Sequence, residues 1–327
     1  MQKKLSIIIP VYNTEEYLER CVNSVINCIQ DGDSIEILLI NDGSTDNSQK
    51  IIDEYSKRYN YIKSISHSNK GQAETRNIGI RLSVGKYIWY IDSDDYIKHF
   101  NLNTLIDFLD NNNIDVCYFK YREGIEKPIE SISLHLDASK IINGNDFFKS
   151  IDFSGHACLY IIKREIVQDV YFDKGRFYED IAYAIEAFSK AQSFYFLEDE
   201  IYEYFVNSNS TIRKTNNTER SFKLCDDLVF ACNRIANFLE LNKKQLSVEK
   251  KKAIYYKWEK LVYYTYGSFT QRRLNRIQLK TVMSRLQFNK FTILQTKAKS
   301  MKQKVMIKIY NSKLLKKIFF ELNLLKR

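Results

Sequence analysis

The chain has 327 residues, 44% of them hydrophobic and 28% charged, which fits a folded protein of one large domain or two ordinary ones. Its 10 glycines and 2 prolines exclude a collagen-like or proline-rich chain. Residues 243–327 hold 23 basic but 3 acidic residues, whereas residues 1–242 hold 27 basic and 37 acidic residues. This asymmetry predicts that the basic C-terminal part of the chain faces a polyanion, either a membrane surface or a nucleic acid.

The cysteines indicate a reducing compartment, and the short apolar runs bear on whether the chain has a signal peptide or a membrane span. None of the six cysteines forms a C-x-x-C pair, so we expect reduced, buried thiols. The first apolar run is short and is interrupted by Pro10, so we expect no signal peptide. No stretch reaches the roughly 20 apolar residues of a membrane-spanning helix. We therefore expect a cytoplasmic protein.

Short β-branched runs alternate with helical patterns in the first part of the chain. Strands are predicted at Leu5–Ile9, Ile35–Ile40, Ile62–Ser66 and Lys86–Ile91, and helices at Glu15–Ile29, Asp46–Arg58 (with Ser44 or Thr45 as its cap) and Gln72–Leu82. This alternation predicts an α/β fold with a mostly parallel sheet, whose ligands bind beyond the carboxyl ends of the strands. The polar residues after the first, second and fourth strands fall at that edge: Asn13, NDGSTD (41–46) and DSDD (92–95).

A mixed pattern follows, and after it a helical one. Short strands at 115–119, 193–197 and 201–205 are predicted with helices at 146–151 and 180–190. From residue 217 the pattern is helical, with segments at 217–241, 248–268, 276–287 and 300–325. Residues 207–217, rich in Asn, Ser and Thr, are the predicted linker.

The two acidic motifs are candidate binding sites. In DSDD, the carboxylates would repel one another unless a cation neutralised them, and Asp92 and Asp94 offer the oxygen ligands that Mg²⁺ or Mn²⁺ prefers. The alternative is a solvated loop that caps the next helix. NDGSTD holds two carboxylates at a strand end, but such residues are equally typical of a polar turn with a helix cap.

A third segment, HSNKGQAETRNIG at 67–79, contains a basic residue about one turn into a predicted helix. Arg76 can pair with a carboxylate of either acidic motif or reach a phosphate, and it can also serve as a structural salt bridge between two loops. The residues leave these alternatives open.

Together these motifs carry a family resemblance. SIIIPVYNTEEYL, NDGSTD, NKGQAETRNIG and YIDSDD, in this order, resemble the family 2 glycosyltransferases with the GT-A fold. FYED at 177–180 resembles the catalytic Glu-Asp segment of that family, and YEYFVNSNSTIRK, from Tyr202, resembles the stretch that closes its catalytic domain. The resemblance implies a GT-A catalytic domain at 1–215, with a nucleotide-binding half at 1–95 and an acceptor-side half at 96–215. It does not explain the basic helical region at 216–327.

The resemblance also implies roles for the residues that match. The nucleotide-sugar site is expected to comprise Pro10, Val11, Tyr12, Glu15, Asp42, Arg76, Asn77, Asp92 and Ser93, with Asp42 at the uracil edge. Asp94 should ligate the metal, with Asp92 at the metal or its water shell. Asp180 should be the general base, with Glu179 beside it, although FYED alone is also typical of an ordinary acidic helix start.

The chain departs from the family pattern in three places. Asn41 stands where Asp is frequent, Thr75 replaces a common Ala, and GHACLYIIKRE at 155–165 lacks the usual Trp of the acceptor side. His156 in that segment is a candidate contact for the acceptor or the donor phosphates, and it is also typical of a hydrogen-bonded structural histidine.

The basic tail at 297–327 has the pattern of an interfacial helix. Its apolar face carries Leu315, Ile318, Phe319, Leu322 and Leu325, and its basic face carries Lys313, Lys316, Lys317 and Arg327. We expect it to bind the anionic inner face of the cell membrane. The alternative is a helix packed on the catalytic domain or on the second subunit of a homodimer.

The resemblance implies an inverting glycosyltransferase that uses Mn²⁺ or Mg²⁺ and moves a hexose or N-acetylhexosamine from a UDP-sugar to a saccharide acceptor in capsule or O-antigen assembly. With the basic tail, it leads us to expect a lipid-linked acceptor. One alternative is a metal-dependent nucleotidyltransferase, which would need a Gly-rich basic stretch that PVYNTEEY lacks. Another is a non-enzymatic protein that binds polyanions through its tail. We expect no nucleic-acid partner, because the acidic motifs would repel phosphate.

Overall fold

The computed structural model describes residues 3–124, 129–150, 154–206, 218–272, 274–286 and 312. The chain divides into two compact units, Met1–Arg213 and Lys214–Arg327. The predicted linker at 207–217 and, apart from Ser312, the predicted helix at 300–325 lie outside the described residues.

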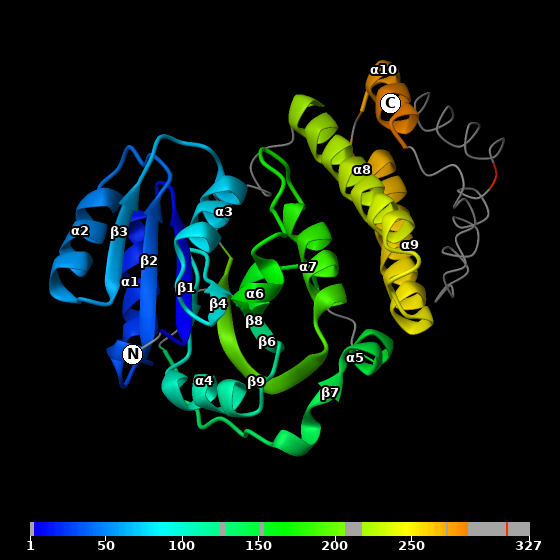
Figure 1. Ribbon diagram of the computed structural model, residues 1–327. Helices are drawn as coiled ribbons and strands as arrows, with labels where there is room; N and C mark the ends of the chain where they lie inside the picture. Colours follow the sequence, from blue (N-terminus) through cyan, green and yellow to red (C-terminus); the bar gives the residue numbers. More distant parts are fainter. Residues whose placement is uncertain are drawn as a thin grey trace. The chain divides into compact units, whose positions relative to one another are not determined.

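The first unit is built on a sheet flanked by helices (Figure 1). Its strands are β1 (Leu5–Val11), β2 (Ile35–Asn41), β3 (Ile62–Ser66), β4 (Tyr87–Tyr90), β5 (Tyr96–Ile97), β6 (Val116–Gly124), β7 (Ile142–Asn143), β8 (Tyr160–Lys163) and β9 (Ser193–Phe205). Its α-helices are α1 (Glu15–Ile26), α2 (Ser48–Arg58), α3 (Gln72–Leu82), α4 (Leu102–Asn111), α5 (Gly144–Ser150), α6 (Arg164–Val167) and α7 (Glu179–Lys190). The strand order is β3-β2-β1-β4-β8-β6-β9-β5, and β7 pairs with β9.

The directions of the strands decide which strand ends lie together at one edge of this sheet. The edge that holds the carboxyl ends of β1, β2 and β4 is called the functional edge from here on. β1 is parallel to β2 and β4, and β2 is parallel to β3. β8 is antiparallel to both β4 and β6, while β9 is parallel to β6. The sheet is therefore parallel from β3 to β4 and mixed beyond β4. As a result, the carboxyl ends of β4, β6 and β9 share one edge with the amino end of β8.

Close packing fixes α3 against the middle of the sheet. β1, β2 and β4 are buried along their whole length, as central strands of apolar and aromatic residues should be. A Cβ atom on Gly79 would lie 2.4 Å from Cγ2 of Ile8, so only a glycine lets the helix approach β1 this closely. This contact sets the position of Arg76, one turn earlier on α3.

Two expectations about the elements were wrong. α2 begins at Ser48 with Asn47 as its N-cap residue, because Ser44 and Thr45 are bonded instead to Asn13 across the loop. The two short strands predicted between 193 and 205 form one strand, β9, whose extra residues between Leu197 and Tyr202 take up the changes of register opposite Lys120 of β6.

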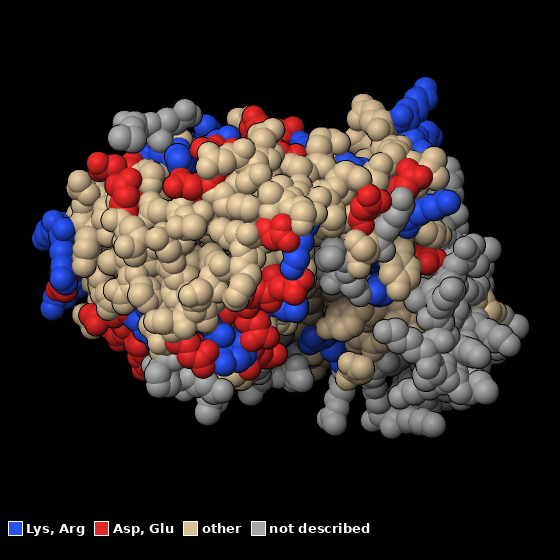
Figure 2. All heavy atoms as spheres, turned by 90° about the horizontal axis from the view of Figure 1, so that it is seen from below, with Lys and Arg blue, Asp and Glu red and all other residues tan. Residues whose placement is uncertain are grey.

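The charge of the first part of the chain is visible on its surface. Residues 1–242 carry 37 acidic against 27 basic residues. The face drawn in Figure 2 shows acidic side chains in groups, interspersed with basic ones.

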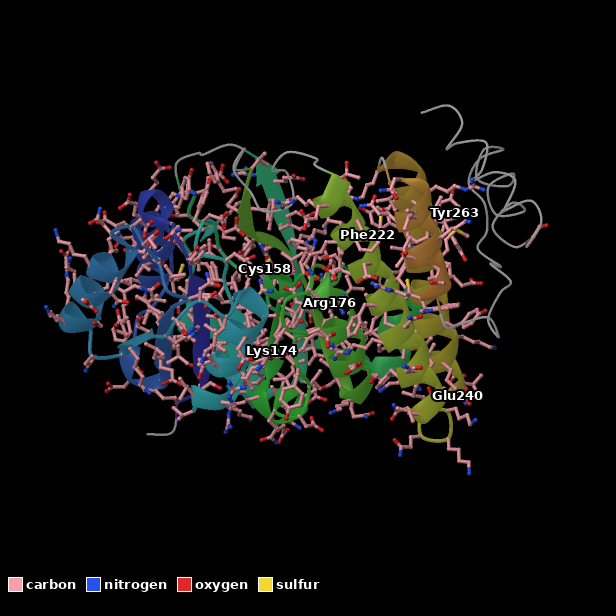
Figure 3. All side chains as sticks on the ribbon, turned by 90° about the horizontal axis from the view of Figure 1, so that it is seen from above. Cys158, Lys174, Arg176, Phe222, Glu240 and Tyr263 are labelled. Carbon is pink, nitrogen blue, oxygen red and sulfur yellow. The ribbon has the colours of Figure 1, made fainter. Side chains whose placement is uncertain are left out.

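The second unit is helical over its described residues. It consists of α8 (Thr218–Leu241), α9 (Val248–Gln271) and α10 (Arg276–Ser284), close to the predicted segments. Figure 3 labels Phe222 and Glu240 on α8 and Tyr263 on α9. Among the described residues, none of the helices is both long and apolar enough to cross a membrane.

The cysteines of both units follow the prediction from the sequence. All six are free thiols and all six are buried. Trp258 of α9 donates a hydrogen bond from Nε1 to the backbone oxygen of Cys232 at 2.8 Å, so this cysteine lies within the packing of the helices.

Candidate functional site

The DSDD loop follows β4 at the functional edge, and Asp95 anchors it. This carboxylate is 1% exposed, and its two oxygens accept hydrogen bonds from the Tyr202 hydroxyl at 2.6 Å and the Phe205 backbone N–H at 2.8 Å. Burial and the neighbouring carboxylates of Asp92 and Asp94 raise the pKa of Asp95. Asp95 therefore ties the loop to the end of β9.

Asp92 belongs to a second connection, which runs through Arg76. One guanidinium nitrogen of Arg76 donates to Oδ1 of Asp92 at 2.7 Å, and another donates to Oε1 of Glu179 at 3.0 Å. Burial alone would lower the pKa of Arg76, but the two carboxylates raise it. Gln72 also donates to Oδ1 of Asp92 at 3.0 Å. Arg76 thus joins the DSDD loop to the start of α7.

Asp94 is the acid of this loop that fits a divalent cation. Its backbone oxygen accepts a hydrogen bond from Arg20 at 2.7 Å, but no basic side chain of the described residues forms an ion pair with its carboxylate. Burial and the Asp92 carboxylate raise the pKa of Asp94 to about 6, because together they outweigh the nearby positive charge of Arg20. A hard divalent ion would supply further positive charge there.

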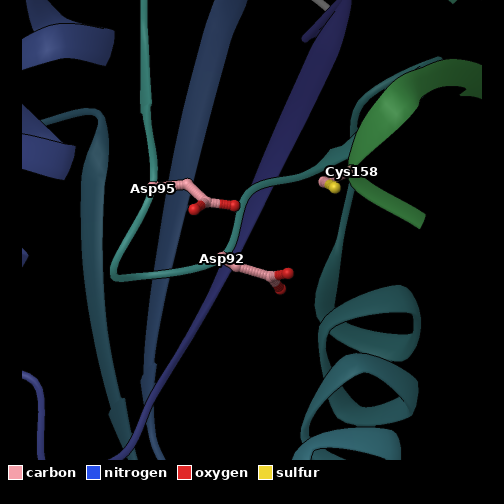
Figure 4. A group of neighbouring side chains, drawn as sticks. All are labelled: Asp92, Asp95 and Cys158. Carbon is pink, nitrogen blue, oxygen red and sulfur yellow. The ribbon is translucent and has the colours of Figure 1, made fainter. Parts of the chain in front are cut away.

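A neighbouring group of possible ligands fits a metal less well. Oxygen atoms of Asp92 and Asp95 and the sulfur of Cys158 lie within 4.8 Å of one another, and Figure 4 shows both carboxyls extending toward the side on which Cys158 lies. Because both oxygens of Asp95 already accept hydrogen bonds and Asp92 is paired with Arg76, this group is explained by internal contacts.

The NDGSTD loop is held against the start of α3 through Asp42. The two carboxylate oxygens of Asp42 accept the backbone N–H groups of Lys70 at 2.6 Å and Gly71 at 2.9 Å. His67 Nδ1 lies 3.4 Å from Oδ1 of Asp42. Gly43 has a φ of +72°, and a Cβ atom there would lie 2.7 Å from the Asn69 nitrogen. The two loops are therefore packed together at a point that only glycine allows.

The other residues expected at the nucleotide are distributed around these loops. Pro10 and Val11 are buried in β1, while Tyr12 is 48% exposed at its end. Glu15 accepts hydrogen bonds from both the backbone and the side chain of Asn47. The Ser93 hydroxyl bonds that of Thr14 at 3.1 Å.

The side chain of Asn77 is hydrogen-bonded to other parts of the protein. It is buried, and its side-chain amide exchanges two hydrogen bonds of 2.9 Å with the backbone of Phe172. A third bond joins the amide nitrogen to Glu74 at 3.3 Å. These bonds hold α3 against the segment that leads into α7, so Asn77 positions Arg76 and Glu179 relative to each other.

The start of α7 carries the two acids of FYED. It is preceded by Tyr178, whose φ of +63° is uncommon for a residue with a side chain. Burial and the Asp180 carboxylate raise the pKa of Glu179 to about 7 despite its bond to Arg76. Lys174 and Arg176, labelled in Figure 3, lie in the chain segment just before this helix.

His156, expected near the acceptor or the phosphates, is exposed at the same edge of the sheet. Its ring lies 6.2 Å from the ring of Tyr121, with an interplanar angle of 68°.

Several residues of this site escape analysis of the sequence. Arg20, Gln72 and Tyr202 contact the DSDD loop. Arg20 lies in an ordinary helical pattern, while Gln72 and Tyr202 lie in two of the family motifs, which assign them no role at this loop. Tyr202 lies 107 residues from Asp95, so no local pattern connects the two.

Comparison with known sequences assigns the family. The family described as "Glycosyl transferase family 2" matches residues 6–171. Glycosyltransferase GlyG of Streptococcus pneumoniae is 31% identical over 230 residues, which cover 65% of this chain and 74% of that protein. The uncharacterized glycosyltransferase EpsJ of Bacillus subtilis is 30% identical over 217 residues, which cover 63% of this chain and 62% of EpsJ. The match thus spans less than two thirds of the length of EpsJ.

Solved structures show the same fold. Staphylococcus aureus TarS 1–349 in complex with UDP-GlcNAc matches with a TM-score of 0.58 at 17% identity, covering 88% of this chain and 90% of that one. The mannosyltransferase PcManGT from Pyrobaculum calidifontis, in complex with GDP-Man and Mn²⁺, matches with a TM-score of 0.55 at 13% identity, covering 99% and 86%. These likenesses confirm the GT-A fold. Since the family match covers half of the chain and the GlyG match covers 74% of that relative, this chain belongs to glycosyl transferase family 2.

Proposed function

We propose that this chain is an inverting glycosyltransferase that moves a hexose or N-acetylhexosamine from a UDP-sugar to a saccharide acceptor in surface polysaccharide assembly. The observation that carries this proposal is the bridge made by Arg76 between Asp92 and Glu179. It brings an acidic loop suited to a nucleotide diphosphate and its cation next to an acidic helix start suited to proton transfer.

The donor would lie along the loops after β1, β2 and β4. Tyr12 offers an exposed aromatic face for the base, and the carboxylate of Asp42 is oriented by two backbone N–H groups. Glu15, Ser93 and Arg76 would complete the contacts with the nucleotide sugar. The solved complexes of TarS with UDP-GlcNAc and with UDP favour a uridine nucleotide as the donor.

Asp180 is the proposed general base. Glu179 is paired with Arg76, whereas no hydrogen bond or ion pair reaches the carboxylate of Asp180 from the part of the chain that the structure describes. The acceptor oxygen would attack the anomeric carbon as the bond from that carbon to UDP breaks, and its proton would pass to Asp180. One such displacement inverts the anomeric centre.

Asp94 would hold Mn²⁺ or Mg²⁺, with Asp92 next to it. Its raised pKa and its lack of an ion pair fit that role. The bound cation would supply positive charge opposite the departing diphosphate. The neighbour with GDP-Man and Mn²⁺ supports a divalent ion in this fold.

We further propose a lipid-linked acceptor and a peripheral position on the inner face of the cell membrane. The tail at 297–327, which apart from Ser312 lies outside the described residues, would make that contact, as the charge of residues 243–327 suggests. A similarity to the minor teichoic acid biosynthesis protein GgaB of Bacillus subtilis, 26% identical over 23% of that protein, supports a role in cell-surface polymers. A homodimer formed through the tail is the alternative use of this segment.

The first test is hydrolysis of UDP-glucose, UDP-galactose, UDP-GlcNAc and UDP-GalNAc, with GDP-mannose for comparison, in Mn²⁺, Mg²⁺ or EDTA. We expect slow release of UDP from one donor, its loss in EDTA, and its loss in Asp94→Asn. Asp107→Asn is the matched control, because Asp107 is an exposed acid paired with Lys4. If no nucleotide sugar is hydrolysed or bound in calorimetry, the proposal fails.

A further inference from the structure

Three aromatic side chains meet at the functional edge, outside the contacts proposed above for the donor. The ring of Tyr121 lies 6.2 Å from that of His156 and 6.3 Å from that of Tyr204, with interplanar angles of 68° and 73°. His156 is exposed and Tyr121 is 36% exposed, whereas the large aromatic residues of the sheet core are buried. The group therefore presents aromatic surface to solvent.

The strand directions place all three rings near the DSDD loop. Tyr121 lies in the second half of β6, Tyr204 is the last residue but one of β9, and His156 precedes the 3₁₀ turn Ala157–Leu159 that enters β8. Since the carboxyl ends of β6 and β9 share an edge with the amino end of β8 and the carboxyl end of β4, the three residues and DSDD lie at the same edge.

The segment of His156 is packed directly on the start of α7. A Cβ atom on Gly155 would lie 2.5 Å from the Cα of Ile181, so the backbone at Gly155 touches the residue that follows Asp180. On the other side of His156, the backbone oxygen of Cys158 accepts a hydrogen bond from Trp89 of β4 at 2.9 Å.

The segment of Tyr204 is tied to the donor loop. Its neighbour Phe205 donates a backbone hydrogen bond to Oδ1 of Asp95 at 2.8 Å. The aromatic group therefore lies on segments that are fixed, by direct contacts, both to the acidic loop and to the proposed base.

We propose that Tyr121, His156 and Tyr204 form the platform on which the acceptor saccharide lies. Aromatic side chains pair large apolar area with polar tips, and a sugar ring offers a C–H face and hydroxyl groups that match both. The expected ligand is a neutral or N-acetylated hexose unit, held with a hydroxyl toward Asp180. This inference rests on the proposed function, because it names where the second substrate of that reaction binds.

The test measures UDP release from the hydrolysed donor against increasing concentrations of p-nitrophenyl glycosides of glucose, galactose and N-acetylglucosamine. We expect Tyr121→Ala and Tyr204→Ala to raise KM for the accelerating glycoside about tenfold, as the loss of a stacked ring should. Hydrolysis without a glycoside and the donor Kd should stay within about twofold of the wild type. Tyr121→Phe keeps the ring and should keep KM.

Tyr256→Ala is the matched control, because Tyr256 is 43% exposed on α9. His156→Ala alters an exposed side chain and supplies a further variant if the tyrosine variants do not fold. An unchanged KM in the alanine variants, or an equal rise in the control, would overturn the platform. So would the failure of every glycoside to accelerate UDP release by a wild type that hydrolyses its donor. A wild type that binds no nucleotide sugar would instead overturn the proposed function, and the platform with it.

Discussion

Arg76 is a buried cation shared by two carboxylates from distant parts of the chain. Its side chain is 6% exposed, against 21% for Asp92 and 11% for Glu179. A buried cation with two partners is costly to remove, because both carboxylates then lose their counter-charge. The site and the stability of the first unit therefore depend on the same residue.

Arg76→Gln should lower the free energy of unfolding by about 3 kcal/mol in urea denaturation. Arg81→Gln is the matched control, since Arg81 also pairs with a glutamate at 3.0 Å but is 53% exposed. That variant should lose less than about 1 kcal/mol. Equal losses of unfolding free energy in the two variants would show that the buried ion pairs of Arg76 stabilise the fold no more than the exposed pair of Arg81.

Asp180→Asn should reduce acceptor-dependent turnover by about 10³-fold while leaving the donor Kd unchanged, because only proton removal from the acceptor is lost. UDP release with and without acceptor, together with calorimetry of the donor, separates the two effects. Glu186→Gln, on the same helix, should behave as the wild type. If Glu179→Gln abolishes turnover and Asp180→Asn does not, the two acids have been assigned the wrong way round.

Glu179 should make stability depend on pH. Its pKa of about 7 in the folded protein lies above the value of about 4.3 for an unfolded glutamate. Between these pH values the folded state keeps a proton that the unfolded chain has lost, so the free energy of unfolding should fall as pH rises from about 4.5 to about 7. Urea denaturation across this range should show a smaller fall for Glu179→Gln. An identical slope in both proteins would contradict the raised pKa.

At the scale of the elements, the close contact between the loops after β2 and β3 requires a glycine at position 43. Gly43→Ala meets both a positive φ and a backbone atom at 2.7 Å, whereas Gly175→Ala meets a φ of +67° with nothing within 4 Å. We expect Gly175→Ala to cost about 1 kcal/mol of stability. Gly43→Ala should cost about 2 kcal/mol more and should also weaken donor binding, because Asp42 would move. Thermal unfolding and calorimetry compare the variants, and equal costs would mean that the loops can separate freely.

Much of the first half of the fold could be predicted because its signals are local. β3 and α3 have the predicted bounds, and β1, β2 and β4 differ by one or two residues at their ends. β8 was missed, because its four buried residues give too short a pattern to separate strand from helix. Its antiparallel direction depends on pairing with β4 and β6, which no local pattern encodes.

The residues of the candidate site likewise include some that the local sequence predicts and some that it does not. The acids of DSDD and FYED are visible as clusters, and they lie together at one edge in the structure. Their partners are not visible, because Arg20, Arg76 and Tyr202 reach them across 74, 103 and 107 residues of chain. Arg76 was recognised as a candidate, yet the choice of both Asp92 and Glu179 as its partners required the fold.

At the scale of the whole molecule, the uneven charge predicts salt-sensitive binding to anionic vesicles. Replacing Lys313, Lys316 and Lys317 with Gln should weaken binding on the order of 100-fold, since each basic residue near such a surface contributes about 1 kcal/mol. Vesicle sedimentation at low and high salt measures this, with Lys50→Gln and Lys57→Gln on α2 as controls. Stronger binding to RNA than to vesicles would favour the polyanion-binding alternative instead.

The anchoring of Asp95 by the last residues of β9 has a consequence for protein engineering. A chimera that joins this catalytic unit to the C-terminal unit of a relative should place its junction after Phe205, because an earlier crossover can remove the Tyr202 hydroxyl, or the backbone N–H at position 205 if the relative has proline there. Such a hybrid would carry every acid of DSDD in its sequence but would lose the bonds that hold the loop in shape. Exchange of C-terminal units between relatives is therefore limited by the hydrogen bonds that join the DSDD loop to the end of β9.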